Sequence, residues 1–168
     1  IRFLYSAFCS AVDSCVYVSS AYTSVYLFPV LVLKISIITI VYNNRETIAD
    51  AIESVLGQTY TDIEYIVIDG ASTDGTVDII KSYGDRIAKF LSEKDGGLYE
   101  AINKGIKLAT GDVIGLLHSD DLFYSHETVS QVADALQVCD TDSIYGDLLY
   151  VKRDDTNKVV RNWISGKY

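Results

Sequence analysis

Four short apolar runs, separated by helical patterns, constrain the fold of this chain more than any other feature. The runs cover residues 35–41, 63–68, 87–91 and 112–117. Between the first two runs, Ile48, Ile52 and Val55 recur at the spacing of one helical face. Strands and helices that alternate with short connections predict a mostly parallel sheet with right-handed crossovers and helices on both faces. We therefore expect an α/β fold.

Turn and cap residues set approximate limits for the other elements. Helices are expected from about Arg45 to Gly57, from 76 to Gly84, from 98 toward Gly111, and over 125–138. Further strands are expected at 143–151 and 158–164. In an open parallel sheet, ligands bind outside the carboxyl ends of the strands. Polar residues at those ends are therefore the first candidates for a site.

Two adjacent carboxylates, Asp120 and Asp121, follow the strand that ends near Leu117. Hard cations such as Mg²⁺ and Mn²⁺ take oxygen ligands, commonly one or two carboxylates together with substrate phosphates. One acid of the pair can therefore bind a metal while the other binds a ribose hydroxyl, with His118 as a polar neighbour. The alternative is that the pair only caps a turn or the next helix.

Other strand ends carry residues suited to a nucleotide. Residues Thr39–Tyr42 offer an aromatic ring and backbone groups for a nucleobase, and Asp69 can accept hydrogen bonds from a base or ribose. Asp95 precedes a glycine pair, where close backbone approach and a helix N-terminus favour an anion. Structural alternatives stay open, because Tyr42 is one of 13 tyrosines and any turn can use two glycines. Asp74 is assigned to a helix cap.

Composition and motifs exclude several classes of protein. A net charge of −9 argues against a nucleic-acid binder, so no nucleic-acid partner is expected. Neither a Gly-x-Gly-x-x-Gly dinucleotide motif nor a P-loop is found. Cys9, Cys15 and Cys139 form no Cys-x-x-Cys pair, and only two histidines occur, so a zinc site is not credible. We interpret the cysteines as reduced thiols of a cytoplasmic protein.

Residues 1–33 differ in composition from the rest, since they hold only one base and one acid. Residues 14–33 are uncharged and long enough to span a bilayer, although Pro29 interrupts them and no basic signal-peptide region precedes them. We expect an atypical apolar leader that packs poorly against a domain at 34–168, and a membrane-associated segment is the open alternative. Because the chain begins at Ile1 and contains no Met, we expect a fragment or a processed product.

Five motifs occur in a fixed order along the chain. They are Ser36–Asn43 (SIITIVYN), Val67–Thr76 (VIDGASTDGT), Ala101–Ile106 (AINKGI), Ala109–Asp112 (ATGD) and His118–Asp121 (HSDD). In this order they resemble the family 2 glycosyltransferases of the GT-A fold, especially bacterial members that build capsular, exopolysaccharide or colanic-acid-type glycans. The resemblance covers residues 34–168. It implies the N-terminal, nucleotide-sugar-binding part of a Rossmann-like domain that is truncated at its C-terminus.

The resemblance implies an inverting enzyme that transfers a sugar from a nucleoside-diphosphate sugar to a glycan or lipid-linked acceptor in polysaccharide biosynthesis. By it, Asp121 would ligate Mn²⁺ or Mg²⁺, and Asp120 would contact the sugar nucleotide. Asp69 and the Tyr42 region would hold the nucleoside, with Asp95 near the base or ribose. The implied location is cytoplasmic, and peripheral association with the inner face of the membrane is left open.

The chain departs from the family pattern in three ways. Many members have Asp-Asp where this chain has Asp69-Gly70, and His118 stands where Asp is common. An arginine that contacts the diphosphate in some members has no clear equivalent, and Lys104 is the candidate for its role.

A general base is the largest gap in this interpretation. Inverting enzymes need an acid that deprotonates the acceptor hydroxyl, and we expect it beyond Tyr168. Asp147 is assigned to the sugar or acceptor side instead. Two alternatives follow: a non-catalytic sugar-nucleotide-binding module, or a nucleotidyltransferase. The second commonly needs a Gly-rich loop after the first strand, and residues 42–45 contain no glycine.

Overall fold

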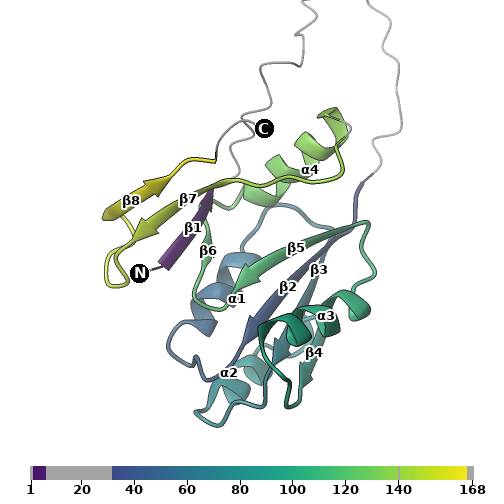
Figure 1. Ribbon diagram of the computed structural model, residues 1–168. Coiled ribbons are helices and arrows are strands. Elements are labelled where there is room, and N and C mark those ends of the chain that lie inside the picture. The colour runs from purple at the N-terminus through teal and green to yellow at the C-terminus, as the bar shows by residue number, and fades with distance from the viewer. Residues whose placement is uncertain (1, 7–31, 140, 166–168) are drawn as a thin grey trace, which may run out of the picture.

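A sheet of four parallel strands, in the order β4-β3-β2-β5, forms the centre of the fold (Figure 1). The structure, a computed structural model, describes residues 2–6, 32–139 and 141–165. The strands are β2 (Ile35–Val41), β3 (Ile63–Asp69), β4 (Lys89–Ser92) and β5 (Val113–His118). Val41 lies opposite Asp69, and Ile40 lies opposite His118, so these carboxyl ends share one edge. The predicted parallel sheet is confirmed.

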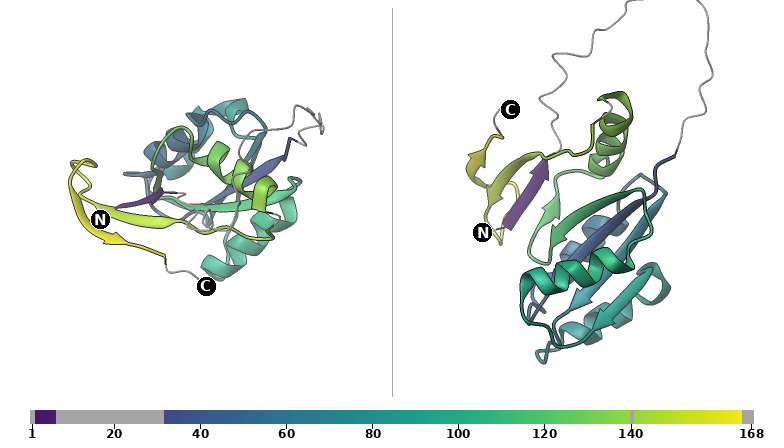
Figure 2. Two further views of the ribbon diagram at one scale, coloured as in Figure 1. Left: turned by 90° about the horizontal axis from the view of Figure 1, so that it is seen from above. Right: turned by 45° about the vertical axis from the view of Figure 1, so that its right-hand side comes forward.

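Helices cover both faces of this sheet (Figures 1 and 2). They are α1 (Ile48–Leu56), α2 (Thr76–Ser82), the short 3₁₀ helix η2 (Gly84–Arg86), α3 (Leu98–Leu108) and α4 (Thr128–Cys139). Helix α3 packs on one face, and α1 and α2 pack on the other. The predicted helices are confirmed, although α1 and α4 begin a few residues later than expected.

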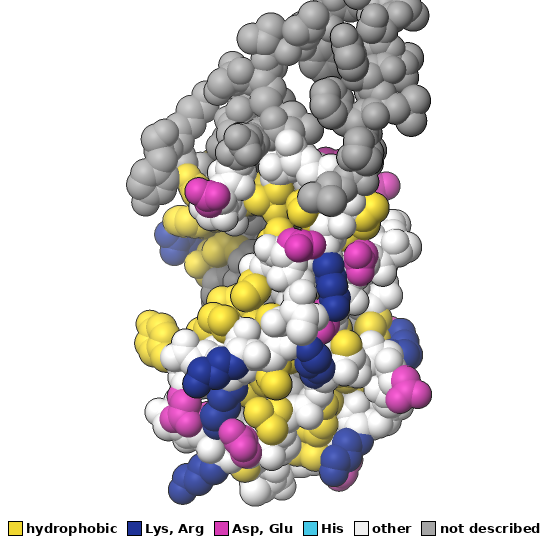
Figure 3. All heavy atoms as spheres, turned by 90° about the vertical axis from the view of Figure 1, so that its right-hand side faces the viewer, with side chains coloured by type: hydrophobic (Ala, Val, Ile, Leu, Met, Phe, Trp, Pro, Cys, Tyr) yellow, Lys and Arg dark blue, Asp and Glu magenta, His cyan; other side chains and the backbone are white. Residues whose placement is uncertain are grey.

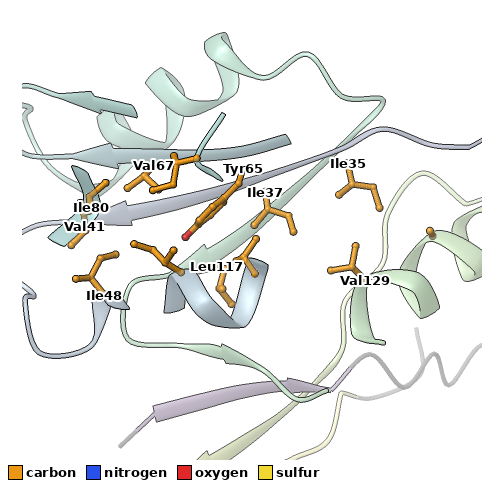
Figure 4. Packing of buried hydrophobic residues seen from close by; sticks show 13 residues of the cluster. Ile35, Ile37, Val41, Ile48, Tyr65, Val67, Ile80, Leu117 and Val129 are labelled. Atoms are coloured by element: carbon orange, nitrogen blue, oxygen red, sulfur yellow. The ribbon is translucent and has the colours of Figure 1, made fainter. Parts of the chain in front are cut away.

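Alternation along the central strand β2 supplies both apolar cores. Successive strand side chains point to opposite faces of a sheet. Ile37 and Val41 therefore belong to the core under α1 and α2 (Figure 4), whereas Ile38 and Ile40 pack with Ala101 of α3. All seven residues of β2 are buried, which explains why its sequence is mostly apolar and β-branched. The two polar side chains, Ser36 and Thr39, form hydrogen bonds with Glu64 and Tyr65.

A second, mixed sheet has the order β6-β1-β7-β8. Its strands are β1 (Arg2–Ser6), β6 (Leu122–Phe123), β7 (Asp147–Val151) and β8 (Val159–Trp163). Strands β7 and β8 confirm two predictions and form an antiparallel pair. Strand β1 lies at the start of the predicted leader, and its backbone pairs with β6 in parallel and with β7 in antiparallel orientation.

Some expectations fall outside the described residues. They concern most of residues 14–33, together with Cys9, Cys15 and the side chain of Cys139. Among the helices that the structure does describe, none combines the length and apolar character needed to cross a bilayer.

On the face drawn in Figure 3, basic and acidic side chains are interspersed with hydrophobic ones.

A buried carboxylate joins the strands at the edge opposite their carboxyl ends. Glu64 is only 4% exposed and lies 2.8 Å from Lys89 Nζ. It also accepts hydrogen bonds from Ser36 Oγ (2.6 Å) and from the amide (2.7 Å) and hydroxyl (2.8 Å) of Thr110. Burial alone would raise the pKa of Glu64, but the Lys89 ammonium and these donors together hold the pKa well below its usual range. Glu64 therefore links β2, β3, β4 and the loop before β5.

Replacing Glu64 with Gln should lower the free energy of unfolding at neutral pH by about 2–4 kcal/mol, because the Lys89 ammonium loses its buried partner. Glu53→Gln is the matched control, since the Glu53–Arg86 pair (3.4 Å) is exposed on both sides and should contribute less than about 1 kcal/mol. Chemical denaturation measures both values. Equal effects of the two variants would contradict the role given to Glu64.

The same carboxylate should make stability depend on pH. Because the pKa of Glu64 is lower in the folded chain, its stabilisation is complete above the unfolded value near 4.5 and is lost as the pH falls below it. Between about pH 5 and about pH 3, wild-type stability should therefore fall more steeply than that of Glu64→Gln. Parallel pH profiles for the two proteins would show that Glu64 does not contribute this dependence.

Candidate functional site

A pocket of about 510 Å³ lies at the carboxyl edge of the central sheet. The ends of β2, β3 and β5, the loop between β4 and α3, and the first turn of α3 form its wall. The lining residues are Ile40, Val41, Tyr42, Gly70, Lys94, Asp95, Gly97, Leu98, Ala101, His118, Ser119 and Asp120. This is the position at which open parallel sheets bind ligands, so the pocket is the candidate site.

Tyr42, Gly70 and Asp95 come together on this wall from three different loops. A Cβ added at Gly70 would lie 3.2 Å from Tyr42 Cδ2 and 3.3 Å from Asp95 Oδ2. Gly70 therefore leaves a narrow space between the Tyr42 ring and the Asp95 carboxylate, which a larger side chain would fill. Tyr42 is 66% exposed, so its ring is available to a ligand. An aromatic face beside a carboxylate suits a planar group that carries hydrogen-bond donors.

Asp69 supplies a fixed carboxylate directly before Gly70. Its Oδ2 accepts hydrogen bonds from the Ser72 amide (3.0 Å) and from Ser92 Oγ (2.7 Å). Its Oδ1 is buried and has no hydrogen-bond partner among the described residues. An unpaired buried acceptor costs free energy, so such an atom is a candidate for a ligand donor.

Hydrogen bonds fix the loop after β2 against the end of β5. Asn44 Nδ2 donates to Ser119 Oγ (3.0 Å), and Thr47 Oγ1 donates to the Ser119 carbonyl (2.8 Å). Ser119 immediately precedes the acidic pair, so these bonds position the pair relative to Tyr42.

Asp74 has a local role just before α2, whose N-cap residue is Gly75. It accepts hydrogen bonds from the Thr76 hydroxyl (2.6 Å) and amide (3.0 Å), and from the Arg45 amide (3.0 Å). These donors, the Thr76 hydroxyl foremost, hold the pKa of Asp74 below its ordinary value. Asp74 is therefore not the predicted N-cap residue, although its carboxylate binds Thr76, the first residue of α2.

The two carboxylates of the acidic pair occupy different environments. Asp120 lines the pocket and is half-buried. Asp121 is 2% exposed, and its amide donates to the His118 carbonyl (3.1 Å) in the turn after β5. Asp120 and His118 therefore lie on the wall, and Asp121 lies buried next to them.

This donor set suits one particular kind of metal site. Within residues 2–6, 32–139 and 141–165, no three His, Cys, Asp or Glu side chains are grouped to hold an ion. Mg²⁺ and Mn²⁺ commonly take one or two protein carboxylates and complete their shell with water and substrate phosphates. Asp120, with Asp121 beside it, fits a cation that gains most of its ligands from a phosphate group.

Five candidates from the sequence are not lining residues of the pocket. Asp69 and Asp121 are the chain neighbours of the lining residues Gly70 and Asp120, whereas the other three have structural contacts elsewhere. Thr39 is fully buried under α1, and its Oγ1 accepts a hydrogen bond from the Tyr65 hydroxyl (3.1 Å). Lys104 lies 3.0 Å from a Glu93 oxygen and does not line the pocket. Asp147 accepts hydrogen bonds from the amide and hydroxyl of Ser165, both 2.8 Å, in the second sheet. Alternation explains Thr39, because it shares a strand face with residues of the α1 core.

Lys94 is a lining residue that the sequence patterns did not single out. It directly precedes Asp95 in the loop between β4 and α3. Its position next to a predicted site residue was the available signal. Leu98 and Ser119 also line the pocket and were not predicted.

Comparisons with known proteins agree with this geometry. The family model described as glycosyl transferase family 2 matches residues 36–167. An uncharacterized glycosyltransferase of Mycobacterium tuberculosis is 41% identical over 103 residues, which are 61% of this chain and 39% of that protein. A PGL/p-HBAD biosynthesis glycosyltransferase of Mycobacterium bovis is 33% identical over 118 residues, which are 68% of this chain and 46% of that protein.

Solved structures show the same fold. The TarS fragment 1–349 of S. aureus, in complex with UDP-GlcNAc, has a TM-score of 0.56 and 27% identity over 62% of this chain and 31% of that chain. The mannosyltransferase PcManGT of Pyrobaculum calidifontis, in complex with GDP-Man and Mn²⁺, has a TM-score of 0.58 and 24% identity over 72% of this chain and 36% of that chain. The latter likeness concerns the fold alone.

The matched segments span less than half of these relatives, between 31% and 46% of their length. The family model, in contrast, extends over most of this chain. The fold, the position of the pocket and the family match therefore agree, and the chain belongs to glycosyl transferase family 2.

Proposed function

We propose that this chain carries the donor-binding part of an inverting, metal-dependent glycosyltransferase of bacterial polysaccharide biosynthesis. The donor is a nucleoside-diphosphate sugar, and the acceptor is a glycan or a lipid-linked saccharide. One observation carries the proposal: a pocket at the carboxyl edge brings Tyr42, Asp95 and Asp120 together in a chain of this family. A cytoplasmic location, with peripheral association at the inner face of the membrane, stays a prediction.

Family membership favours glycosyl transfer over nucleotidyl transfer. TarS, which shares the fold at 27% identity, binds UDP-GlcNAc in its solved complex. That complex supports a nucleotide sugar as the class of donor for this chain, although the nucleobase and sugar here are open. The name of the Mycobacterium bovis relative, a PGL/p-HBAD biosynthesis glycosyltransferase, likewise supports a role in biosynthesis.

We assign the nucleoside to the side of the pocket formed by Tyr42, Gly70 and Asp95. The exposed Tyr42 ring offers a stacking surface, and Asp95 offers an acceptor at its edge. The unpartnered Oδ1 of Asp69 supplies a second acceptor one residue from this wall. Binding at these groups would fix the donor relative to the acidic pair, which lies at the end of β5.

We assign a divalent cation, Mn²⁺ or Mg²⁺, to the acidic pair. The family resemblance gives the metal to Asp121 and the sugar nucleotide to Asp120. In the structure, however, Asp120 lines the pocket and Asp121 is buried, which favours Asp120 as the residue that contacts the cation directly. When bound, such a cation offsets the negative charge that develops on the departing diphosphate. The chain's own residues orient the donor, so that an acceptor hydroxyl can approach the anomeric carbon from the opposite side. The base that takes the proton of that hydroxyl is assigned to none of the described residues.

Substituting either member of the acidic pair should weaken metal-assisted nucleotide binding. In calorimetric titrations with UDP and GDP, Mn²⁺ should tighten binding to the wild type, and Asp120→Asn or Asp121→Asn should reduce that gain by about tenfold or more. Asp78→Asn, on the exposed side of α2, is the matched control and should change nothing. If both pair variants keep the full response to Mn²⁺, the metal assignment is wrong.

The variant Thr39→Val tests whether Thr39 belongs to the core or to the binding site. The change leaves the buried Tyr65 hydroxyl without its partner, so the free energy of unfolding should fall by about 1–3 kcal/mol. Nucleotide affinity should stay within twofold of the wild type, roughly 0.4 kcal/mol, because Thr39 does not line the pocket. A large loss of affinity in a variant that remains folded would return Thr39 to the binding site.

A further inference from the structure

Lys104 of α3 is held by two carboxylates and a backbone carbonyl. Its Nζ lies 3.0 Å from Glu93 Oε1 and 3.5 Å from Glu100 Oε1, and it donates to the Lys94 carbonyl (3.3 Å). The side chain is only 16% exposed, whereas both glutamates are about half exposed. These contacts occupy the ammonium, so Lys104 is poorly placed to serve as the diphosphate contact that the sequence suggested.

The contacts of Lys104 belong to a set that fixes the loop between β4 and α3. Glu100 Oε2 accepts a hydrogen bond from the Gly96 amide (2.8 Å), and Asp95 Oδ1 accepts one from the Gly97 amide (2.9 Å). Together with the bond from Lys104 to the Lys94 carbonyl, they fasten residues 94–97 to the first turns of α3.

Helix α3 in turn is seated closely on the central sheet. A Cβ added at Gly105 would lie 2.5 Å from Ile38 Cγ2 and 3.4 Å from Ile68 Cγ1. Lys104 precedes this glycine in the helix, so the close packing of Gly105 also fixes the backbone position of Lys104. Helix α3 therefore packs against β2 and β3, and Lys104 of this helix holds the loop that lines the pocket through the Lys94 carbonyl.

The pocket has an unusual balance of charge for a site that would bind a diphosphate. Lys94 is the one Lys or Arg among its described lining residues, whereas Asp95 and Asp120 are both acidic. The whole chain has a net charge of −9, so its long-range field does not attract an anion. No ion pair of Lys94 occurs within the described part of the chain, and its side chain is exposed.

We propose that Lys94 is the cationic contact for the diphosphate of the donor, and that Lys104 is the residue that positions it. This inference rests on the proposed function, because it assumes that the pocket binds a nucleoside diphosphate. Lys104 acts through the Lys94 carbonyl, which keeps the backbone of the loop at the pocket wall while leaving the Lys94 ammonium available to the ligand. The two lysines thus divide between them the role that the sequence gave to Lys104 alone.

The test compares a nucleoside diphosphate with its uncharged nucleoside. The wild type is titrated with UDP and uridine, and with GDP and guanosine, at low and high salt. Lys94→Met should weaken binding of the diphosphate about 3- to 10-fold, leave nucleoside affinity unchanged, and reduce the salt dependence of diphosphate binding. Lys81→Met, at an exposed position of α2, is the matched control and should behave as the wild type.

A second comparison tests the positioning role. Lys104→Met should weaken diphosphate binding in the wild-type background but add little in the Lys94→Met background, since Lys104 acts through Lys94. Lys104→Arg should restore most of the affinity. Additive losses in the double variant, or an equal loss for the nucleoside, would overturn the positioning role.

The outcomes for the two proposals are distinct. If the wild type binds neither UDP nor GDP, the proposed function fails. If it binds one of them and Lys94→Met binds the diphosphate as tightly as the wild type, only the lysine assignment fails. If Lys94→Met weakens diphosphate and nucleoside equally, Lys94 contacts the nucleoside and the assignment to the diphosphate is wrong.

Discussion

Parallel pairing of β2 with β3 and β5 is the constraint on which the rest of the structure depends. Because these strands run in one direction and in matched register, Val41, Asp69 and His118 end at one edge of the sheet. The loops that follow must then share that edge, whatever their sequences are. A pocket assembled from segments about 30 and 75 residues apart, as the Asn43–Thr73 and Asn44–Ser119 bonds illustrate, follows from this geometry.

Charged side chains have different surroundings at the amino ends and at the carboxyl ends of the parallel strands. At the amino edge, Glu64 is buried and bound by Lys89, Ser36 and Thr110, so its charge is fully compensated inside the protein. At the carboxyl edge, Asp69 keeps one oxygen unpartnered among the described residues, and Asp120 faces the pocket. A buried carboxylate that keeps all its partners stabilises the fold, whereas a carboxylate oxygen without a partner can accept a hydrogen bond from a ligand. A ligand bound at the carboxyl ends of the strands would therefore supply the hydrogen-bond partners that these carboxylates lack in the part of the chain that the structure describes.

Much of the fold follows from sequence pattern, because a strand buried on both faces is mostly apolar. The run from Ile35 to Val41 meets this condition, since its two polar side chains, Ser36 and Thr39, are hydrogen-bonded inside the protein. The ends of the predicted strands then indicated Tyr42 and Asp120, and the glycine pair before the third helix indicated Asp95. Nearness to a strand end does not decide which face a side chain occupies, and Thr39 lies buried with its hydroxyl bonded to Tyr65.

Other features depend on tertiary contacts that no local pattern carries. The exchange of roles between Lys94 and Lys104 depends on how the loop folds back on α3. Strands β1 and β6 pair through backbone groups of residues more than 100 positions apart, and β6 has only two residues. Neither hydrophobic period nor charge pattern could reveal such a pairing.

The most direct test of the central claim is to map where a nucleoside diphosphate binds. Isotope-labelled protein would be titrated with UDP or GDP in the presence of Mg²⁺, and its backbone amide resonances would be followed. The account predicts saturable shifts concentrated at Tyr42, Gly70, Asp95 and Asp120, with residues of β8 unaffected. Absence of binding by both nucleotides, or shifts centred away from the carboxyl edge, would contradict it.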